Sequence, residues 1–130
     1  MGLRAALAAV VLTVLGGGGD ADTVQTVALT MKHSRFVPEV VDVRPGAAVR
    51  IVVHNLDPID HELIVGDDNV QEAHERGTEA HHGDRPGEVS VPAGATAVTE
   101  LTVGRDDVPF GCHLPGHWDY GMRGVLRTRR

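Results

Sequence analysis

Cysteine, aromatic residues and positive charge are all scarce in this chain of 130 residues. It contains one cysteine, two phenylalanines, one tryptophan and one tyrosine, and its formal net charge is -6. A single cysteine excludes an internal disulfide framework, and the acidic balance argues against a nucleic-acid partner. The length permits one domain with a hydrophobic core and is too short for two.

The apolar run near the N-terminus is too short for a comfortable membrane span. Residues 5–15 form an 11-residue apolar stretch behind Arg4, which fits the central region of a secretory signal peptide. Small residues stand at Gly19 and Ala21, so we expect residues 1–21 to be a cleaved leader. The protein is then exported, to a periplasm or out of the cell, with no stable membrane insertion after cleavage. An uncleaved anchor is the alternative, and it would need a longer apolar run.

The rest of the chain, residues 22–130, has the pattern of a single all-β domain. Its apolar residues often alternate with polar ones, and Pro-Gly or Ala-Gly pairs interrupt them where the chain turns. No segment shows a convincing 3.6-residue stripe, and there is no internal repeat. Short strands at intervals of roughly ten residues favour an antiparallel or mixed β-sandwich. The expected strands are residues 23–31, 39–55, 61–66, 88–103, 108–113 and 124–128.

One long connection, residues 67–87, is polar, charged and rich in histidine. Connections of this length are usually functional or mobile. Residues 69–76 could form two helical turns before Gly77 ends them. Two explanations of the histidines stay open: a solvated loop in which they happen to accumulate, or a second metal site at the surface. The candidate ligands of that second site are His74, His81 and His82, with Glu75 and Glu79 nearby.

The segment "GCHLPGHWDYGM", residues 111–122, gathers the only cysteine with two histidines and a methionine. An unpaired cysteine in an exported protein needs protection, as a buried thiol, an intermolecular disulfide or a metal ligand. Cys112, His117 and Met122 are each five positions apart. A thiolate, two imidazoles and a weak axial thioether suit copper. The missing imidazole has a natural candidate in His61, at the head of a predicted strand.

Other assignments of these donors are weaker. Structural zinc sites usually gather more cysteines than this chain has. His113 follows Cys112 directly, and neighbours on a strand point to opposite faces, so it is left out of the ligand set. His33 and His54 do not belong to a comparable cluster of sulfur and nitrogen donors in the sequence and are expected to be ordinary strand or surface residues.

These motifs together resemble the cupredoxin family of blue copper proteins, which includes plastocyanin and azurin. The motifs are "F-x-P" at residues 36–38, "V-x-P-G" at 43–46, "HNLDPIDHELIV" at 54–65 and "C-x4-H-x4-M" at 112–122. The five-and-five ligand spacing is similar to that of rusticyanin. The resemblance implies a Greek-key β-sandwich with one type 1 copper ion. Its ligands would be His61, Cys112, His117 and Met122.

This chain differs from many cupredoxins at one position beside the predicted ligands, and the resemblance also implies where redox partners dock. Many cupredoxins have Asn or Ser directly after the upstream histidine, whereas this chain has Glu62. A carboxylate there could change the reduction potential, or turn inward and coordinate the metal. The family implies that the edge of His117 is the electron port, where redox proteins dock. The docking patch would consist of Leu114, Pro115 and Trp118.

Three functions follow for comparison. The first is an exported electron carrier in which copper cycles between Cu(I) and Cu(II) and a monomer shuttles between redox partners. The second is a protein for copper binding, delivery or resistance that uses a second site in the histidine-rich loop. An enzyme is not expected, because four protein ligands leave copper no position for a substrate. The resemblance favours the electron carrier.

Overall fold

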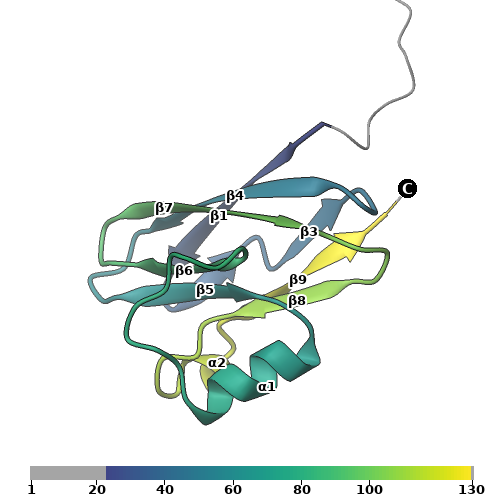
Figure 1. The fold of residues 1–130 in the computed structure, drawn as a ribbon. Coiled ribbons are helices and arrows are strands. Elements are labelled where there is room, and N and C mark those ends of the chain that lie inside the picture. Colours follow the sequence, from purple (N-terminus) through teal and green to yellow (C-terminus); the bar gives the residue numbers. More distant parts are fainter. Residues whose placement is uncertain (1–22, 130) are drawn as a thin grey trace, which may run out of the picture.

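The computed structural model describes residues 23–129. Two β-sheets face each other, and helix α1 (Asp68–Arg76) lies beside one of them (Figure 1). The predicted leader, residues 1–21, falls outside the described residues. Between residues 23 and 129, no helix is both long and apolar enough to cross a membrane.

One sheet has four strands with a parallel pair at its centre. In spatial order they are β2 (Arg35–Val37), β1 (Gln25–Lys32), β4 (Ala48–Asn55) and β7 (Thr96–Thr102). β1 and β4 run parallel, with Val27 opposite Ile51, whereas β2 and β7 join antiparallel. The sheet is therefore mixed, and its central strands have neighbours on both sides.

The other sheet has five strands and carries the cysteine-containing segment. In spatial order they are β3 (Val40–Val43), β9 (Arg123–Thr128), β8 (Val108–Gly111), β5 (His61–Val65) and β6 (Glu88–Val91). β3 and β9 are parallel and the other pairs are antiparallel. Because β5 and β8 are neighbours, the start of β5 and the end of β8 come to the same end of the sandwich. This pairing positions the site described below.

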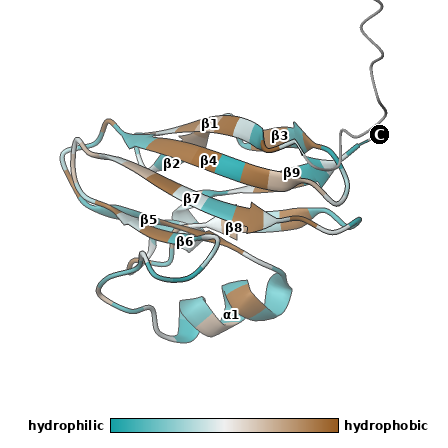
Figure 2. Cartoon of the chain, turned by 45° about the horizontal axis from the view of Figure 1, so that its top comes forward, coloured by the Kyte–Doolittle hydropathy of each residue, from teal (hydrophilic) through white to brown (hydrophobic). Residues whose placement is uncertain are grey.

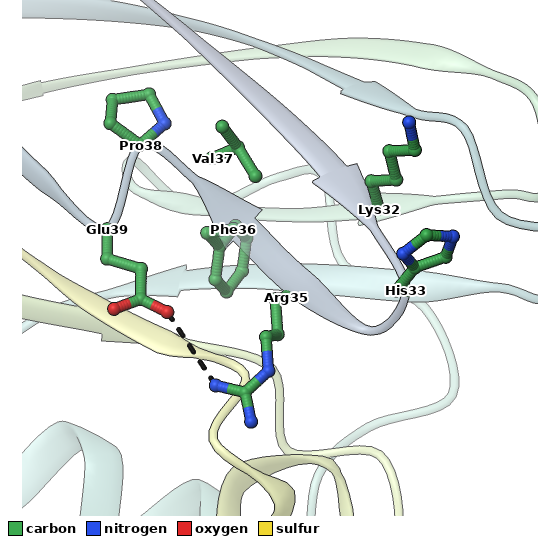
Figure 3. A pocket seen from close by; sticks show the side chains of 7 residues that line it. All are labelled: Lys32, His33, Arg35, Phe36, Val37, Pro38 and Glu39. Carbon is green, nitrogen blue, oxygen red and sulfur yellow. Dashed lines mark ion pairs between the residues drawn. The ribbon is translucent and has the colours of Figure 1, made fainter.

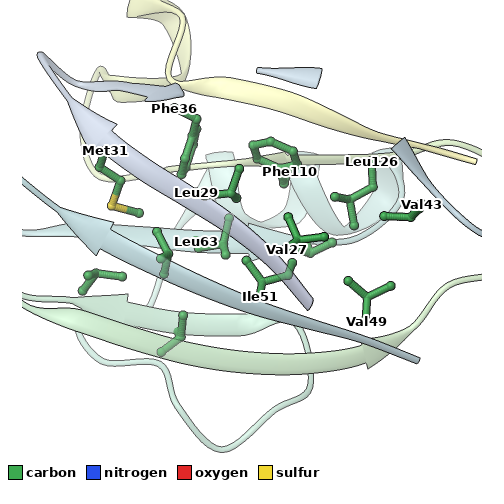
Figure 4. Packing of buried hydrophobic residues seen from close by; sticks show 14 of the residues in the cluster. Val27, Leu29, Met31, Phe36, Val43, Val49, Ile51, Leu63, Phe110 and Leu126 are labelled. Carbon is green, nitrogen blue, oxygen red and sulfur yellow. The ribbon is translucent and has the colours of Figure 1, made fainter. Parts of the chain in front are cut away.

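The hydrophobic core fills the space between the sheets (Figure 4). Alternate residues of β1 point inward, so Val27, Leu29 and Met31 are buried. Phe36 and Phe110 pack edge to face, with ring centroids 5.1 Å apart. Burial of an apolar side chain of this size stabilises the fold by about 1.5–3 kcal/mol. In a chain with one cysteine, this packing replaces the disulfides that hold many small exported domains together.

Helix α1 and the loop after it cover the outer face of β5. All five residues of β5 are buried, because one face points to the core and the other lies under this segment. Asp67 caps the helix by accepting a hydrogen bond from the N–H of Val70, and Gly77 follows its last residue. Gln71, on the buried side, donates to the carbonyl oxygen of Ile64 at 3.0 Å. The helix predicted here is confirmed, and most of its residues are hydrophilic (Figure 2).

The predicted fold class, an all-β sandwich, is confirmed. Two of the predicted strands are each divided in two by a turn. The first divides at Gly46 (φ +74°) and the second at Gly94 (φ +73°), where the backbone is left-handed. Two elements were not predicted, because each is too short for a periodic pattern. They are β2 and the single helical turn α2 (His117–Tyr120).

Candidate metal centre

Three of the predicted ligands meet at one end of the sandwich. His61 is the first residue of β5, Cys112 directly follows β8, and His117 begins α2. The Nδ1 atom of His117 lies 3.3 Å from the sulfur of Cys112 and 3.3 Å from Nδ1 of His61. The three ligand atoms all lie within 4.8 Å of one another. Residues up to 56 positions apart in the sequence thus form one compact donor group with a thiol and two imidazoles.

Asp57 fixes the orientation of His61. Its Oδ2 atom lies 2.7 Å from Nε2 of His61. The carboxylate accepts there, so Nε2 carries the proton and Nδ1 is left to face the donor group, 3.3 Å from Nδ1 of His117. The same carboxylate accepts from the backbone N–H groups of His33 and Ser34, at 2.7 and 2.8 Å. Burial alone would raise the pKa of Asp57, but these hydrogen bonds from Ser34, His61 and His33 outweigh it and lower that pKa.

Cys112 is fully buried. Burial raises the pKa of its thiol to about 11, although the N–H groups of Glu62 and Leu114 donate to the sulfur and lower it. Without a cation the residue is therefore a thiol, and it becomes a good thiolate ligand only when a positive charge replaces the proton. A fully buried sulfur cannot reach a cysteine of a second molecule in this conformation. Of the three explanations considered for the unpaired cysteine, an intermolecular disulfide is the one that the geometry disfavours.

His117 lies at the edge of the group and is half-buried. Burial lowers the pKa of His117, and the nearby His61 lowers it further. The neutral imidazole is therefore favoured, which is the form that binds metals. Two hydrogen bonds tie its turn together: its N–H donates to the oxygen of Leu114 at 2.9 Å, and its own oxygen accepts from Met122 at 3.0 Å.

Arg35 fastens the His117 turn to the other sheet. Its guanidinium donates to the backbone carbonyl oxygen of Tyr120 at 3.2 Å. The guanidinium also lies 4.9 Å from the centre of the Tyr120 ring. Figure 3 shows Arg35 extending from β2 toward this turn, with Glu39 as its ion-pair partner at 3.7 Å. Gly121 closes the turn with φ +112°, and a Cβ there would lie 2.9 Å from the guanidinium. The left-handed backbone favours glycine at this position, whereas the guanidinium, at the end of a flexible side chain, could move aside.

Met122 is fully buried in the core cluster, which also contains Cys112. Its carbonyl oxygen accepts from the N–H of Cys112 at 3.1 Å. The main chain of Met122 is therefore hydrogen-bonded directly to those of Cys112 and His117. Axial ligation by Met122 stays a prediction.

His113 points away from the donor group, in agreement with its exclusion from the predicted ligands. Its ring nitrogens lie 2.8 Å from Glu75 and 2.6 Å from Gln71, both on α1. Trp118 stacks on the His113 ring, with centroids 4.7 Å apart. Gly111 permits this packing, because a Cβ there would clash with the indole of Trp118. His33 and His54 are exposed and also lie outside the group.

Glu62 turns its carboxylate away from the donor group. Oε1 accepts from the N–H of His113 at 2.9 Å, and both oxygens lie 2.9 Å from the hydroxyl of Thr78. Oε2 lies 3.0 Å from Nε2 of His82. Of the two roles considered for this residue, inward coordination does not fit these contacts. An effect on the potential stays a prediction.

The histidine-rich loop also assembles a group, with a different membership from the predicted one. His74 and His82 come together, and their third neighbour is Glu88, the first residue of β6. His81 is exposed and lies outside. The group is mostly buried rather than on the surface, because the loop folds back over β5 and β6.

Two residues of these arrangements were missed by sequence reasoning. Asp57 lies four residues before His61, and a carboxylate at that spacing from a predicted ligand is a signal that could have identified it. Glu88 lies at the end of the loop, 14 positions after His74. No short-range pattern connects these two residues, since the pairing of β6 with β5 brings them together.

Comparison with known proteins supports the fold and the metal. The sequence model of the family described as "Cupredoxin-like domain" matches residues 5–88. The chain is 37% identical over 125 residues to the copper-resistant cuproprotein CopI of Rubrivivax gelatinosus, covering 90% of this chain and 74% of that protein.

Solved structures show the same fold at lower identity. The reduced auracyanin of the photosynthetic bacterium Roseiflexus castenholzii aligns with a TM-score of 0.69 at 16% identity, over 82% of this chain and 98% of its own. A multicopper oxidase aligns with a TM-score of 0.61 at 16% identity, over 82% of this chain and 39% of its own. These two likenesses establish the fold alone. With the family match and the CopI relative, they lead to one conclusion: the chain belongs to the cupredoxin family of copper proteins.

Proposed function

We propose that this protein is an exported type 1 copper protein that carries single electrons between redox partners. The observation that carries the proposal is the convergence of His61, Cys112 and His117, whose ligand atoms lie within 4.8 Å of one another. Met122, hydrogen-bonded through its main chain to Cys112 and His117, is the proposed axial ligand. The proposal includes one copper ion at this centre.

The donor set fits copper better than the other common metals. One cysteine, two histidines and a methionine combine soft sulfur with imidazole, as blue-copper centres do. Bound there, copper supplies a one-electron couple between Cu(I) and Cu(II). The protein contributes a rigid frame, because His61 is held by Asp57 and the His117 turn is held by Arg35. A rigid donor set keeps the geometry similar in both oxidation states, which suits electron transfer.

We propose that redox partners approach over His117. Its ring is half-buried, so one edge reaches the surface while Nδ1 faces Cys112. Pro115 is exposed and Leu114 is half-buried beside it. The indole of Trp118 packs on His113 and lies 5.0 Å from the Arg123 guanidinium, so it supports the turn more than it forms a patch. Leu114 and Pro115 are therefore the apolar contacts that we assign to a docking protein.

Copper handling is the second candidate function. The relative at 37% identity is named for copper resistance, and it is a cuproprotein. A protein that binds or delivers copper would use the same first centre and would add a second, exchangeable ion. The histidine-rich loop is the part of the described chain that suits this role.

An enzymatic role is not proposed, although one structural neighbour is an oxidase. Four protein ligands at the Cys112 centre leave no coordination position for a substrate. Export is proposed because the predicted leader precedes the domain and because an unpaired cysteine held by a metal is compatible with an oxidising compartment. We propose a monomer as the working state.

The test is the visible spectrum of the purified protein, reduced and then titrated with Cu(II). We expect an intense blue thiolate band that saturates at one equivalent and is bleached reversibly by a reductant. Cys112→Ser should abolish the band, whereas His113→Gln should keep it. A spectrum with no thiolate band would reject the centre. A blue ion that dissociates readily, rather than cycling while bound, would favour copper handling over electron transfer.

A further inference from the structure

A second group of metal-ligand side chains lies between α1, its following loop and β6. His74 comes from the last turn of α1, His82 from the loop, and Glu88 from the start of β6. Their ligand atoms lie within 4.8 Å of one another. Glu88 Oε1 is 3.4 Å from Nε2 of His74, and Oε2 is 3.2 Å from Nδ1 of His82. One carboxylate therefore faces one ring nitrogen of each histidine.

The remaining ring nitrogen of each histidine faces an acceptor. Nδ1 of His74 lies 2.8 Å from the carbonyl oxygen of Val70, which can only accept, so this nitrogen carries a proton. Nε2 of His82 lies 3.0 Å from the carboxylate of Glu62 and carries a proton for the same reason. The neutral form of each histidine then directs a lone pair at Glu88. Metal-ligating histidines are usually held in this way, with the outer N–H donated to a carbonyl or a carboxylate.

The charges of this group call for a cation. The side chains of Glu62 and Glu88 are 2% and 10% exposed, and that of His82 is 1% exposed. In the part of the chain that the structure describes, every ion pair of an arginine is with another carboxylate, not with Glu62 or Glu88. Buried carboxylates are costly unless they are paired. Either a proton or a metal ion must therefore lie between the two lone pairs and the Glu88 carboxylate.

We propose that His74, His82 and Glu88 bind a second divalent metal ion, separate from the centre at Cys112. Imidazole and carboxylate ligands suit copper and zinc, and among the divalent first-row ions Cu(II) binds such donors most tightly. Cu(II) is therefore the ion that we assign. Because no thiolate is present, this ion contributes no intense blue band. Three protein ligands leave at least one coordination position for water or another small ligand.

The site has an approach from solvent. A pocket of about 160 Å³ lies beside His82 and Glu88. Its lining also includes Glu79 and the exposed His81. A carboxylate and an imidazole at this entrance would favour the approach of a cation, although neither belongs to the three-residue group. His81 can thus be changed without removing a proposed ligand.

Glu62 connects the two sites. Its Oε2 faces His82, and its Oε1 accepts from the N–H of His113, the residue directly after Cys112. The outer partner of a proposed ligand in the second site is therefore also a neighbour of the first site. Two hydrogen bonds, from His82 to Glu62 and from Glu62 to the N–H of His113, therefore connect a metal ion bound at His82 with the main chain next to Cys112.

The test counts copper in the full protein after Cu(II) loading and removal of loosely held metal. We expect two ions for each protein molecule: one with the blue band, and one seen by electron paramagnetic resonance as an ordinary Cu(II) signal without that band. His74→Gln and Glu88→Gln should each lose the second ion and keep the blue band, which shows that the variant is folded. His81→Ala is the matched control and should keep both ions.

Each other outcome has a definite meaning. A wild-type protein that holds only the blue ion would show that protons alone satisfy the group, and would overturn the second site. So would a second ion that survives His74→Gln and Glu88→Gln, or one that is lost in His81→Ala alone. A protein without any blue band that still binds one Cu(II), lost in His74→Gln, would support the second site while rejecting the proposed centre at Cys112.

Discussion

The Oδ2 atom of Asp57 lies 2.7 Å from Nε2 of His61, and this contact leaves Nδ1 of the histidine to face His117 in the donor group. The same carboxylate holds the backbone of His33 and Ser34, both of which have positive φ. The turn between β1 and β2 and the orientation of a proposed copper ligand therefore depend on one buried residue.

Asp57→Asn tests this dependence. The amide keeps the size of the side chain but has only one acceptor oxygen, so it cannot accept from His33, Ser34 and His61 as the carboxylate does. We expect copper affinity at the blue centre to fall about 10- to 100-fold, as for other partners that orient metal ligands. Competitive titration against a Cu(II) chelator measures this change. Asp119→Asn, an exposed carboxylate in the His117 turn, should leave the affinity unchanged; an equal loss in both variants would remove the special role of Asp57.

Glu62→Gln should affect both proposed sites. Removing a buried negative charge next to Cys112 disfavours Cu(II) relative to Cu(I), so the reduction potential should rise, on the order of tens of millivolts. The same change weakens the hydrogen bond that orients His82, and the second ion should bind about 10- to 100-fold less tightly. Spectroelectrochemistry of the blue band and copper counting measure the two effects. A lower potential in the variant would contradict the proposed position of this charge.

Met122→Gln tests the axial ligand. Replacing a thioether by a harder amide oxygen favours Cu(II), so the potential should fall while the blue band persists. A buried amide also costs stability, about 1–3 kcal/mol. Met31→Gln introduces the same amide at another fully buried methionine and is the control. It should destabilise the protein with little change in potential, and equal potentials in the two variants would argue against axial Met122.

The stability of the metal-free protein should fall at alkaline pH because of Cys112. Burial raises the pKa of this thiol from its usual 9.0 to about 11. The folded state therefore holds the proton more tightly than the unfolded state does. The stabilisation that results is complete below pH 9 and is lost as the pH rises to 11, up to about 2–3 kcal/mol.

Urea unfolding with a chelator present, at pH 8 to 11, measures this loss. The Cys112→Ala protein lacks the thiol and should show a smaller decline over the same range. Copper should remove the alkaline decline in the wild-type protein, since the metal takes the place of the proton. Identical declines in both metal-free proteins would show that the thiol titrates as if it were exposed.

Much of the fold and of the first centre could be predicted from the sequence, because the relevant information is local. Alternation along β1 and β4 and the turn at Gly46 follow from neighbouring residues. Cys112, His117 and Met122 lie in one short segment. Their residue types and spacing therefore indicate a metal site without knowledge of the fold. His61 was also predicted, from its place at the head of a strand and from the family resemblance.

The amino-acid sequence by itself determined the class of fold, the donor types and their order, since those depend on residue identity and short-range spacing. Only the tertiary structure decided which side chains became partners across the sheets. Strand pairing brought Glu88 rather than His81 to His74 and His82, and it directed Glu62 away from Cys112. These choices depend on register and burial, which distant segments set together and which no single stretch of the chain contains.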